Sequence, residues 1–183
     1  DRIFGRESAQ AGESFVTPDM VGHEIGSELV NVVDNPLVPG SYGYYKYDNE
    51  GVKGRKKVLI KNGVITEFLH NRETAYHMDL PSNGSSRATD YDKESIVRMS
   101  NTYMLKGKST EEEVLDIKKG VYVKNFMEWN IDDKRLNQKY TGAEAYLVEN
   151  GEITKPVISP VIEVATPDLW KAVDCVGNKE RLF

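Results

Sequence analysis

The chain has 183 residues, with 24 Lys or Arg against 29 Asp or Glu, so its formal net charge is −5 at pH 7. An acidic chain lacks the cationic field that neutralises phosphates, which weighs against direct DNA binding. A hydrophobic content of 39% is too high for a disordered chain, and no apolar run approaches the roughly 20 residues of a membrane helix. The single cysteine, Cys175, excludes an internal disulfide and is typical of a reducing, cytoplasmic location.

The N-terminal part is expected to be irregular before the first strands begin. Glycines and a proline interrupt every periodic pattern in residues 1–27, which predicts loops. Residues 28–34 (Glu-Leu-Val-Asn-Val-Val-Asp) predict a strand that ends at Asn35-Pro36. Residues 41–48 contain four tyrosines and predict a second strand, because aromatic side chains favour strands.

Two Asn-Gly pairs predict β-hairpins. Asn62-Gly63 lies within residues 58–66, and Asn150-Gly151 lies in the same way within residues 146–154, each between β-rich runs. Asn and Gly accept the positive φ angles of a type I′ turn, whose twist matches that of paired strands. The likeness of the two segments is explained either by internal duplication or by the chemistry that such hairpins share.

Three short helices are expected, over residues 70–78, 109–120 and 166–176. The second offers two capping boxes, Ser109 with Glu112 or Thr110 with Glu113, and Gly120 is suited to its end. The third is expected to begin with a capping hydroxyl from Thr166, followed by a proline in the first turn.

Further strands are predicted over residues 97–105, 121–126 and 143–148. Tight turns rather than long crossovers link the strands, which favours antiparallel pairing. The predicted fold class is therefore α+β and β-rich, a mostly antiparallel sheet or barrel-like domain with about three short helices. Residues 1–183 are expected to form a single domain.

Few residues could bind a metal. His23-Glu24 resembles the start of a zinc-protease helix, but the second histidine of that motif is absent. His70, Glu73 and His77 share one face of the first predicted helix, which suits either a transition metal or a solvated polar surface. Cys175 has no cationic neighbour in the sequence, which favours a small buried side chain over a nucleophile.

Two polar regions are candidates for binding. The tyrosines of residues 41–48 and the basic residues 55–57 suit a nucleic-acid platform, although the net charge opposes it. The long polar loop 81–92 is either a surface loop or a functional one. In the strand predicted after it, Asn101 interrupts an apolar face, so its amide is expected either to fix backbone or to receive a ligand.

Several blocks together resemble the TldD branch of the TldD/PmbA family, historically named modulators of DNA gyrase. The resemblance covers nearly the whole chain, and the blocks 98–105 and 144–151 are its most specific parts. The matching segments, in order, are residues 28–34, the first Asn-Gly hairpin, 98–105, Asn125-Phe126, 144–151 and 176–178.

The resemblance implies a zinc-dependent peptidase that acts on unfolded proteins or peptides as a dimer of like or paired subunits. In the family the metal ligands are an H-E-x-x-x-H helix and a C-terminal cysteine, and neither aligns with His23-Glu24 or Cys175. The chain therefore resembles the body of a TldD-type C-terminal domain whose metal-bearing ends lie outside it. Neither a catalytic residue nor a metal ligand is expected within this chain.

The same resemblance places a substrate cleft beside the polar loop and the strand that follows it. The expected substrate-binding residues are Asn83, Gly84, Arg87, Arg98 and Asn101. Arg98 would meet a substrate carboxylate or carbonyl, and Asn101 would anchor backbone. An extended peptide can pair along a free strand edge with little sequence preference. The alternative is a non-catalytic partner or scaffold subunit of a TldD/PmbA-type complex.

The missing ligands give a direct prediction. The isolated 183-residue chain should hold no stoichiometric zinc and hydrolyse no peptide, because zinc sites in peptidases need three protein ligands. Metal analysis of the purified chain checks this, and one tightly bound zinc per chain would contradict it.

Overall fold

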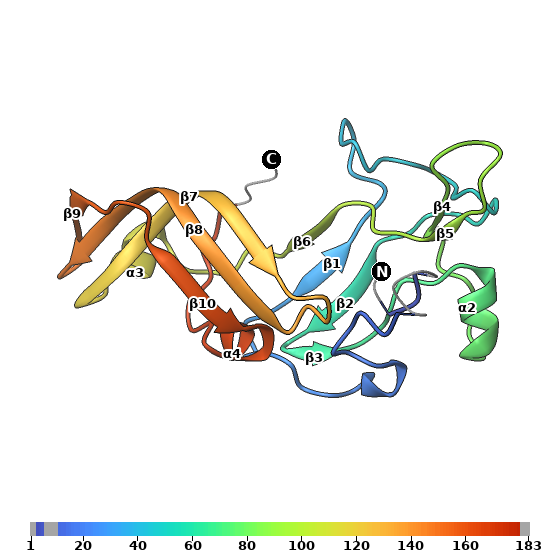
Figure 1. Ribbon diagram of the computed structural model, residues 1–183, viewed down its shortest axis with the longest axis horizontal. Coiled ribbons are helices and arrows are strands. Elements are labelled where there is room, and N and C mark those ends of the chain that lie inside the picture. The colour runs from blue at the N-terminus through green and yellow to red at the C-terminus, as the bar shows by residue number, and fades with distance from the viewer. Residues whose placement is uncertain (1–2, 6–10, 180–183) are drawn as a thin grey trace. The chain divides into compact units, whose positions relative to one another are not determined.

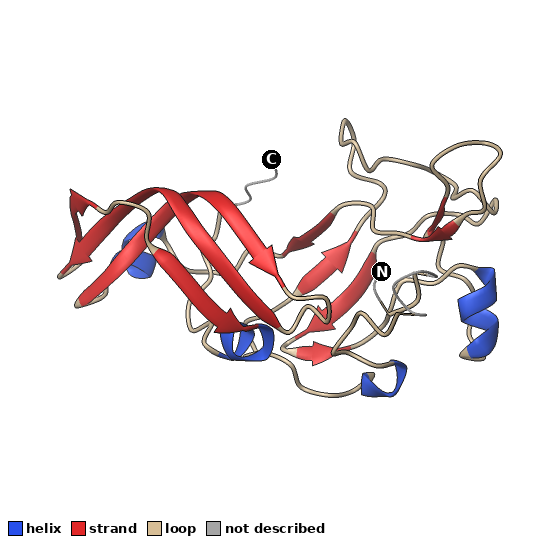
Figure 2. Ribbon diagram, viewed as in Figure 1, coloured by secondary structure: helices blue, strands red, loops and turns tan. Residues whose placement is uncertain are grey.

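The structure, a computed structural model, describes residues 3–5 and 11–179 (Figure 1). Antiparallel strands dominate it, and its helices are short (Figure 2). The predicted α+β, mostly antiparallel class is confirmed in its sheet form, because every sheet among the described residues is an open array of strands. None of the described helices has the length and hydropathy needed to cross a bilayer.

The chain divides into two compact units, Asp1–Leu105 and Lys106–Phe183, and each is described by itself. In the first unit, a four-stranded sheet has the order β3-β2-β1-β6, and β4 pairs separately with β5. The elements of this unit are η1 (Pro18–Met20), β1 (Val32–Asp34), β2 (Lys57–Lys61), β3 (Val64–Ile65), α2 (Arg72–His77), β4 (Ser86–Arg87), β5 (Ile96–Val97) and β6 (Thr102–Met104).

The second unit consists mainly of one long antiparallel hairpin. Its two strands have 13 residues each, and bulges between Val123 and Glu128 interrupt their register. β10 and β9 both pair with the second of these strands. The elements of this unit are α3 (Glu111–Leu115), β7 (Lys119–Ile131), β8 (Asn137–Glu149), β9 (Glu152–Pro156), β10 (Val161–Ala165) and α4 (Thr166–Lys171).

Both predicted Asn-Gly hairpins are confirmed. Asn62 and Gly63 join β2 to β3 with φ angles of 49° and 77°. Asn150 and Gly151 join β8 to β9 with φ angles of 51° and 83°. Two consecutive positive φ angles are what a type I′ turn requires, so local chemistry alone sets these two turns.

The strand predicted over residues 41–48 is wrong. Most of this stretch is irregular, with a turn at Tyr42 and Gly43 and an isolated bridge from Tyr47 to Lys53. The Ser41 hydroxyl donates to the Val38 carbonyl, and a Cβ on Gly43 would lie 2.7 Å from the backbone of Ser100. Turn bonds and this close backbone approach override the strand preference of the aromatic side chains.

The single strand predicted over residues 97–105 is also wrong. Residues 96–97 and 102–104 belong to different sheets, because the chain bends at Ser100 and Asn101 between them. The alternation that placed Asn101 on an apolar face therefore does not exist. The strand predicted from residue 28 is shorter than expected and begins at Val32.

All three predicted helices exist, but each is shorter than expected. Thr110 and Glu113 form the capping box of α3, one of the two boxes predicted. This helix ends at Leu115 rather than Gly120, because Gly120 already pairs with β8. α4 ends at Lys171, and it has no side-chain cap. The Thr166 hydroxyl instead donates to the carbonyl of Arg135.

The core of the first unit lies against the hairpin of β2 and β3. Ile25, Ile65 and Phe68 form its buried centre. The partly buried side chains packed against this centre are Ile3, Phe4, Phe15, Val16, Met20 and Ile60. The hairpin itself touches the segment before β1 so closely that a Cβ on Gly63 would lie 2.1 Å from the Gly26 carbonyl oxygen.

The two turn glycines allow a matched comparison. Gly63→Ala and Gly151→Ala both force a side chain to positive φ, which costs about 1–2 kcal/mol per residue. Only the first also creates a backbone clash, because the nearest atom to a Cβ on Gly151, the Leu115 carbonyl oxygen, lies 3.9 Å away. We expect Gly63→Ala to be the more destabilising substitution by at least about 1 kcal/mol. Hydrogen exchange of the amides in each hairpin measures the loss of stability in each variant. Equal losses in the two variants would contradict the prediction.

Candidate functional site

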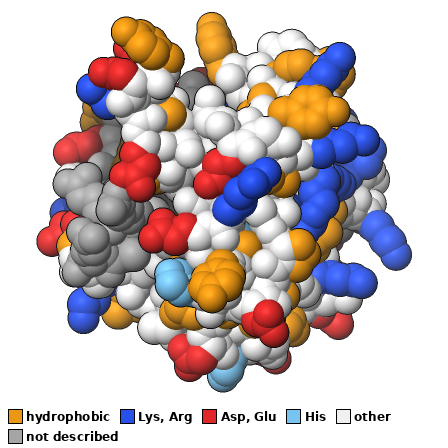
Figure 3. Space-filling view, turned by 90° about the vertical axis from the view of Figure 1, so that its right-hand side faces the viewer, with side chains coloured by type: hydrophobic (Ala, Val, Ile, Leu, Met, Phe, Trp, Pro, Cys, Tyr) orange, Lys and Arg blue, Asp and Glu red, His pale blue; other side chains and the backbone are white. Residues whose placement is uncertain are grey.

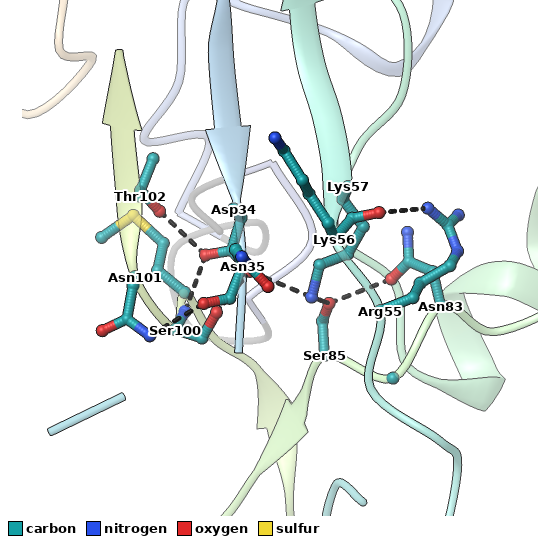
Figure 4. Close-up of polar contacts among 12 residues, drawn as sticks. Asp34, Asn35, Arg55, Lys56, Lys57, Asn83, Ser85, Ser100, Asn101 and Thr102 are labelled. Atoms are coloured by element: carbon teal, nitrogen blue, oxygen red, sulfur yellow. Dashed lines mark hydrogen bonds and ion pairs between the residues drawn. The ribbon is translucent and has the colours of Figure 1, made fainter. Parts of the chain in front are cut away.

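The polar centre of the first unit is a buried ion pair between Asp34 and Lys57 (Figure 4). The Lys57 Nζ lies 2.9 Å from the Asp34 Oδ1, and neither side chain is exposed to solvent. Asp34 is the last residue of β1 and Lys57 is the first of β2, and the two are direct partners in the antiparallel register. Strand pairing therefore places the two charges side by side.

Asp34 also binds the segment that leads into β6. Its Oδ2 accepts the Ser100 N–H at 2.7 Å and the Thr102 hydroxyl at 2.9 Å. Its Oδ1 accepts the Ser100 hydroxyl at 2.6 Å. With Lys57 included, four donors converge on one carboxylate, which is how a buried charge is compensated in a protein interior.

The electrostatics favour the ionised carboxylate. Burial raises the pKa of Asp34, but the hydrogen bonds from Ser100 and the charge of Lys57 outweigh it, so this pKa lies below its ordinary value. For Lys57 the effect of burial is larger: it lowers the pKa of the ammonium group below its ordinary value, although the negative charge of Asp34 opposes this change. Because the folded-state pKa of Asp34 is depressed, its stabilisation is complete above about pH 4 and is lost as the pH falls through the depressed pKa.

On the other side of Lys57 the network continues to a buried asparagine. The Lys57 Nζ donates to the Ser85 hydroxyl at 3.1 Å, and this hydroxyl donates to the Asn83 Oδ1 at 3.0 Å. Asn83 also accepts the backbone N–H of His70 and donates to the carbonyl of Phe68. Loop 83–85, β2 and β1 are thus joined by one continuous set of polar contacts.

The structure places the five predicted site residues in different roles. Asn83 is buried and fully hydrogen-bonded within the chain. Gly84 has a φ of 72°, and its carbonyl accepts the Tyr45 hydroxyl. The Arg87 guanidinium donates to the Met99 carbonyl and lies over the ring of Tyr45, 5.6 Å from its centroid.

The two remaining predicted residues flank the bend before β6. Arg98 is exposed, and its backbone N–H donates to the Ser85 carbonyl. Asn101 exchanges two bonds with Asn35, because its side chain donates to the Asn35 carbonyl and its own carbonyl accepts the Asn35 N–H. Asn101 therefore fixes backbone within the chain, as one of its two predicted roles required. Contact of any of the five residues with a substrate stays a prediction.

The metal alternative over His70, Glu73 and His77 does not form. His70 precedes α2, and its buried Nδ1 lies 3.2 Å from the Thr74 hydroxyl. Burial lowers the pKa of His70, and the charge of Glu67 opposes this. Within residues 3–5 and 11–179, no group of three His, Cys, Asp or Glu side chains is arranged to hold a metal. The described residues therefore do not fit a zinc site.

Sequence reasoning missed the ion pair itself. The sequence predicts for Asp34 only the end of a strand before Asn35-Pro36, and it places Lys57 in the basic run of residues 55–57. On one side of the molecule, Lys and Arg side chains do gather at the surface (Figure 3). Lys57 is not among the exposed ones, since its side chain has 0% exposure. The only sequence signal for an inward-facing Lys57 is Leu59, an apolar residue two positions along the strand and therefore on the same face.

Residues 2–183 match the family described as the PmbA/TldA metallopeptidase C-terminal domain. The chain belongs to this family, as its sequence blocks predicted.

Relatives and a solved structure agree with this assignment. A metalloprotease of Methanocaldococcus jannaschii is 40% identical over 168 residues, which cover 91% of this chain and 37% of that protein. A zinc metalloprotease TldD homologue of Saccharolobus solfataricus is 34% identical over 157 residues, covering 84% of this chain and 35% of that protein. TldE from Thermococcus kodakarensis has the same fold, with a TM-score of 0.80, 24% identity and coverage of 97% and 40% of the two chains. The chain spans little more than a third of the curated relatives it matches.

The buried pair gives a prediction on stability. Lys57→Met leaves the Asp34 carboxylate buried without its cation, which should cost about 3–5 kcal/mol in the free energy of unfolding of the first unit. The double variant Asp34→Asn with Lys57→Met should be more stable than Lys57→Met alone, because it removes the unpaired charge. Lys56→Met, at an exposed neighbour, is the control and should cost less than about 0.5 kcal/mol. Hydrogen exchange of β1 and β2 is the measurement, and equal losses at positions 56 and 57 would contradict the prediction.

Proposed function

We propose that this chain forms the substrate-binding body of a zinc-dependent peptidase that acts on unfolded proteins or peptides. Its membership of a metallopeptidase family supports a peptidase role, and the similarity to a Saccharolobus zinc metalloprotease supports zinc. The proposal places the metal ligands outside this chain, in accord with the poor fit of the described residues to a metal. The chain then contributes binding and orientation of the substrate.

The observation that carries the proposal is the outer edge of β6. This strand ends the order β3-β2-β1-β6, and no further strand pairs with it among the described residues. Leu105 donates to Asn31 and Asn101 accepts from Asn35, so the backbone groups of alternate residues face β1. By the alternation of an antiparallel ladder, the N–H and C=O groups of Thr102 and Met104 point away from the sheet.

Such an edge suits a peptidase of broad specificity. An extended peptide that adds to it is held by main-chain hydrogen bonds, which every sequence can make. An unfolded protein offers such extended segments, whereas a folded protein has already paired most of its backbone. Exposed Arg98 lies just before the bend into this strand, where it would meet a carboxylate or carbonyl of the peptide.

The finer expectations on assembly and location belong to the same proposal. We expect a second subunit, either like this one or of the paired TldD/PmbA type, and a cytoplasmic location. Direct association with DNA forms no part of the proposed function, since the net charge of −5 opposes it.

A proline on the strand edge tests the proposal in the full-length protein. Met104→Pro removes an outward-facing N–H without removing a bond to β1, and proline is tolerated at such edge positions. For an unstructured fluorogenic peptide we expect KM to rise about tenfold, since a backbone hydrogen bond contributes about 0.5–1.5 kcal/mol and tenfold corresponds to about 1.4 kcal/mol. Met104→Ala keeps the N–H and is the matched control, with KM within about twofold of the parent.

Zinc content and steady-state kinetics are measured together for both variants. An unchanged KM in Met104→Pro would rule out this edge as the substrate-binding surface. A parent protein that binds the peptide but contains no zinc and cleaves nothing would instead establish the scaffold alternative.

A further inference from the structure

At Thr102, β6 is held to β1 by a side-chain contact. Thr102 and Asp34 form a non-hydrogen-bonded pair of the antiparallel ladder. The N–H and C=O groups of Thr102 point away from β1, so no backbone hydrogen bond joins this residue to that strand. The contact across this pair is made by side chains, because the Thr102 hydroxyl donates to the Asp34 Oδ2 at 2.9 Å. Side chains of such pairs are closer than those of hydrogen-bonded pairs, which makes this contact possible.

The same carboxylate fixes the bend that leads into the strand. Ser100 donates both its N–H and its hydroxyl to Asp34, at 2.7 and 2.6 Å. The direction in which the chain enters β6 therefore depends on Asp34 as well. Lys57 holds this carboxylate from the opposite side, at 2.9 Å, and is itself buried and held by Ser85. As Figure 4 shows, Asp34 lies between these two sets of partners.

Stability alone does not account for a fully buried ion pair here. Apolar side chains of similar volume often replace such pairs with no loss of stability, because desolvation of the two charges offsets their attraction. A carboxylate, unlike an apolar side chain, can accept hydrogen bonds from two positions of one segment in a fixed geometry. The bonds to Ser100 and Thr102 exploit this property.

We propose that Asp34 is a positioning residue for the substrate: through Ser100 and Thr102 it holds the outward-facing backbone groups of β6 in the geometry that an added peptide strand requires. This inference rests on the proposed function of that edge. Its ligand is the backbone of an extended peptide, and Asp34 itself, being buried, does not touch the substrate. Lys57 contributes by compensating the negative charge of the Asp34 carboxylate.

Thr102 offers the cleanest test in the full-length protein. Thr102→Val keeps the shape of the side chain and removes its hydrogen bond to Asp34 without unpairing the buried charge from Lys57. We expect KM for the unstructured fluorogenic peptide to rise about five- to tenfold while kcat changes less than about twofold, because the lost geometry affects binding. Thr102→Ser restores a hydroxyl and should return KM to within about twofold of the parent.

A binding measurement complements the kinetics. Fluorescence anisotropy of the labelled peptide with the full-length protein treated with chelator reports affinity without turnover, and Thr102→Val should weaken it by the same factor as KM. All assays are run well below the melting temperature of each variant, so that a purely structural role leaves KM and affinity unchanged.

The outcomes separate this inference from the proposed function. If Met104→Pro raises KM but Thr102→Val changes neither KM nor affinity, the edge binds substrate and the positioning role of Asp34 is wrong. If Met104→Pro has no effect, the proposed function fails, and the positioning role fails with it. A rise in KM for Thr102→Val that Thr102→Ser does not reverse would also overturn the positioning role, since the hydroxyl is then not responsible.

Discussion

The buried charge of Asp34 is the constraint on which the arrangement of the first unit depends. β1 and β6 have three residues each, so their ladders contain few backbone hydrogen bonds. The Asp34 carboxylate accepts three further hydrogen bonds and the ion pair with Lys57. These four contacts join β1, β2 and the start of β6 at one point. An uncompensated charge at that depth would cost several kcal/mol, so its partners are fixed together with it.

The polar residues around the ion pair are also occupied within the chain. Buried amides must satisfy their donors and acceptors, and Asn83 and Asn101 do so on the backbone of their own chain. Asn101 therefore fixes the bend before β6, and Asn83 fixes the loop on the β2 side of Lys57. The outward main-chain groups of Thr102 and Met104 on the edge of β6 are the groups to which the proposed peptide strand would bind.

Local chemistry made part of the fold predictable. The Asn-Gly turns, the Thr110–Glu113 capping box and the hairpins of β2 with β3 and of β8 with β9 all follow from contacts within a few residues of the chain. The errors fall where distant segments compete with local preference. The bend at Ser100 divides a predicted strand because Asp34, 66 residues away, binds it, and α3 ends early because Gly120 pairs with β8.

By itself, the sequence determined the family, the β-rich class and the positions of the tightest turns, because each of these is encoded in short blocks of neighbouring residues. Only the tertiary structure decided which polar residues are buried and which are exposed. Lys56 and Lys57 are adjacent and chemically identical, yet one is exposed and the other is fully enclosed beside Asp34. Strand pairing creates that difference, since it brings together the charges of Asp34 and Lys57, which are 23 residues apart in the sequence. No local sequence pattern indicates which distant residue compensates a buried charge.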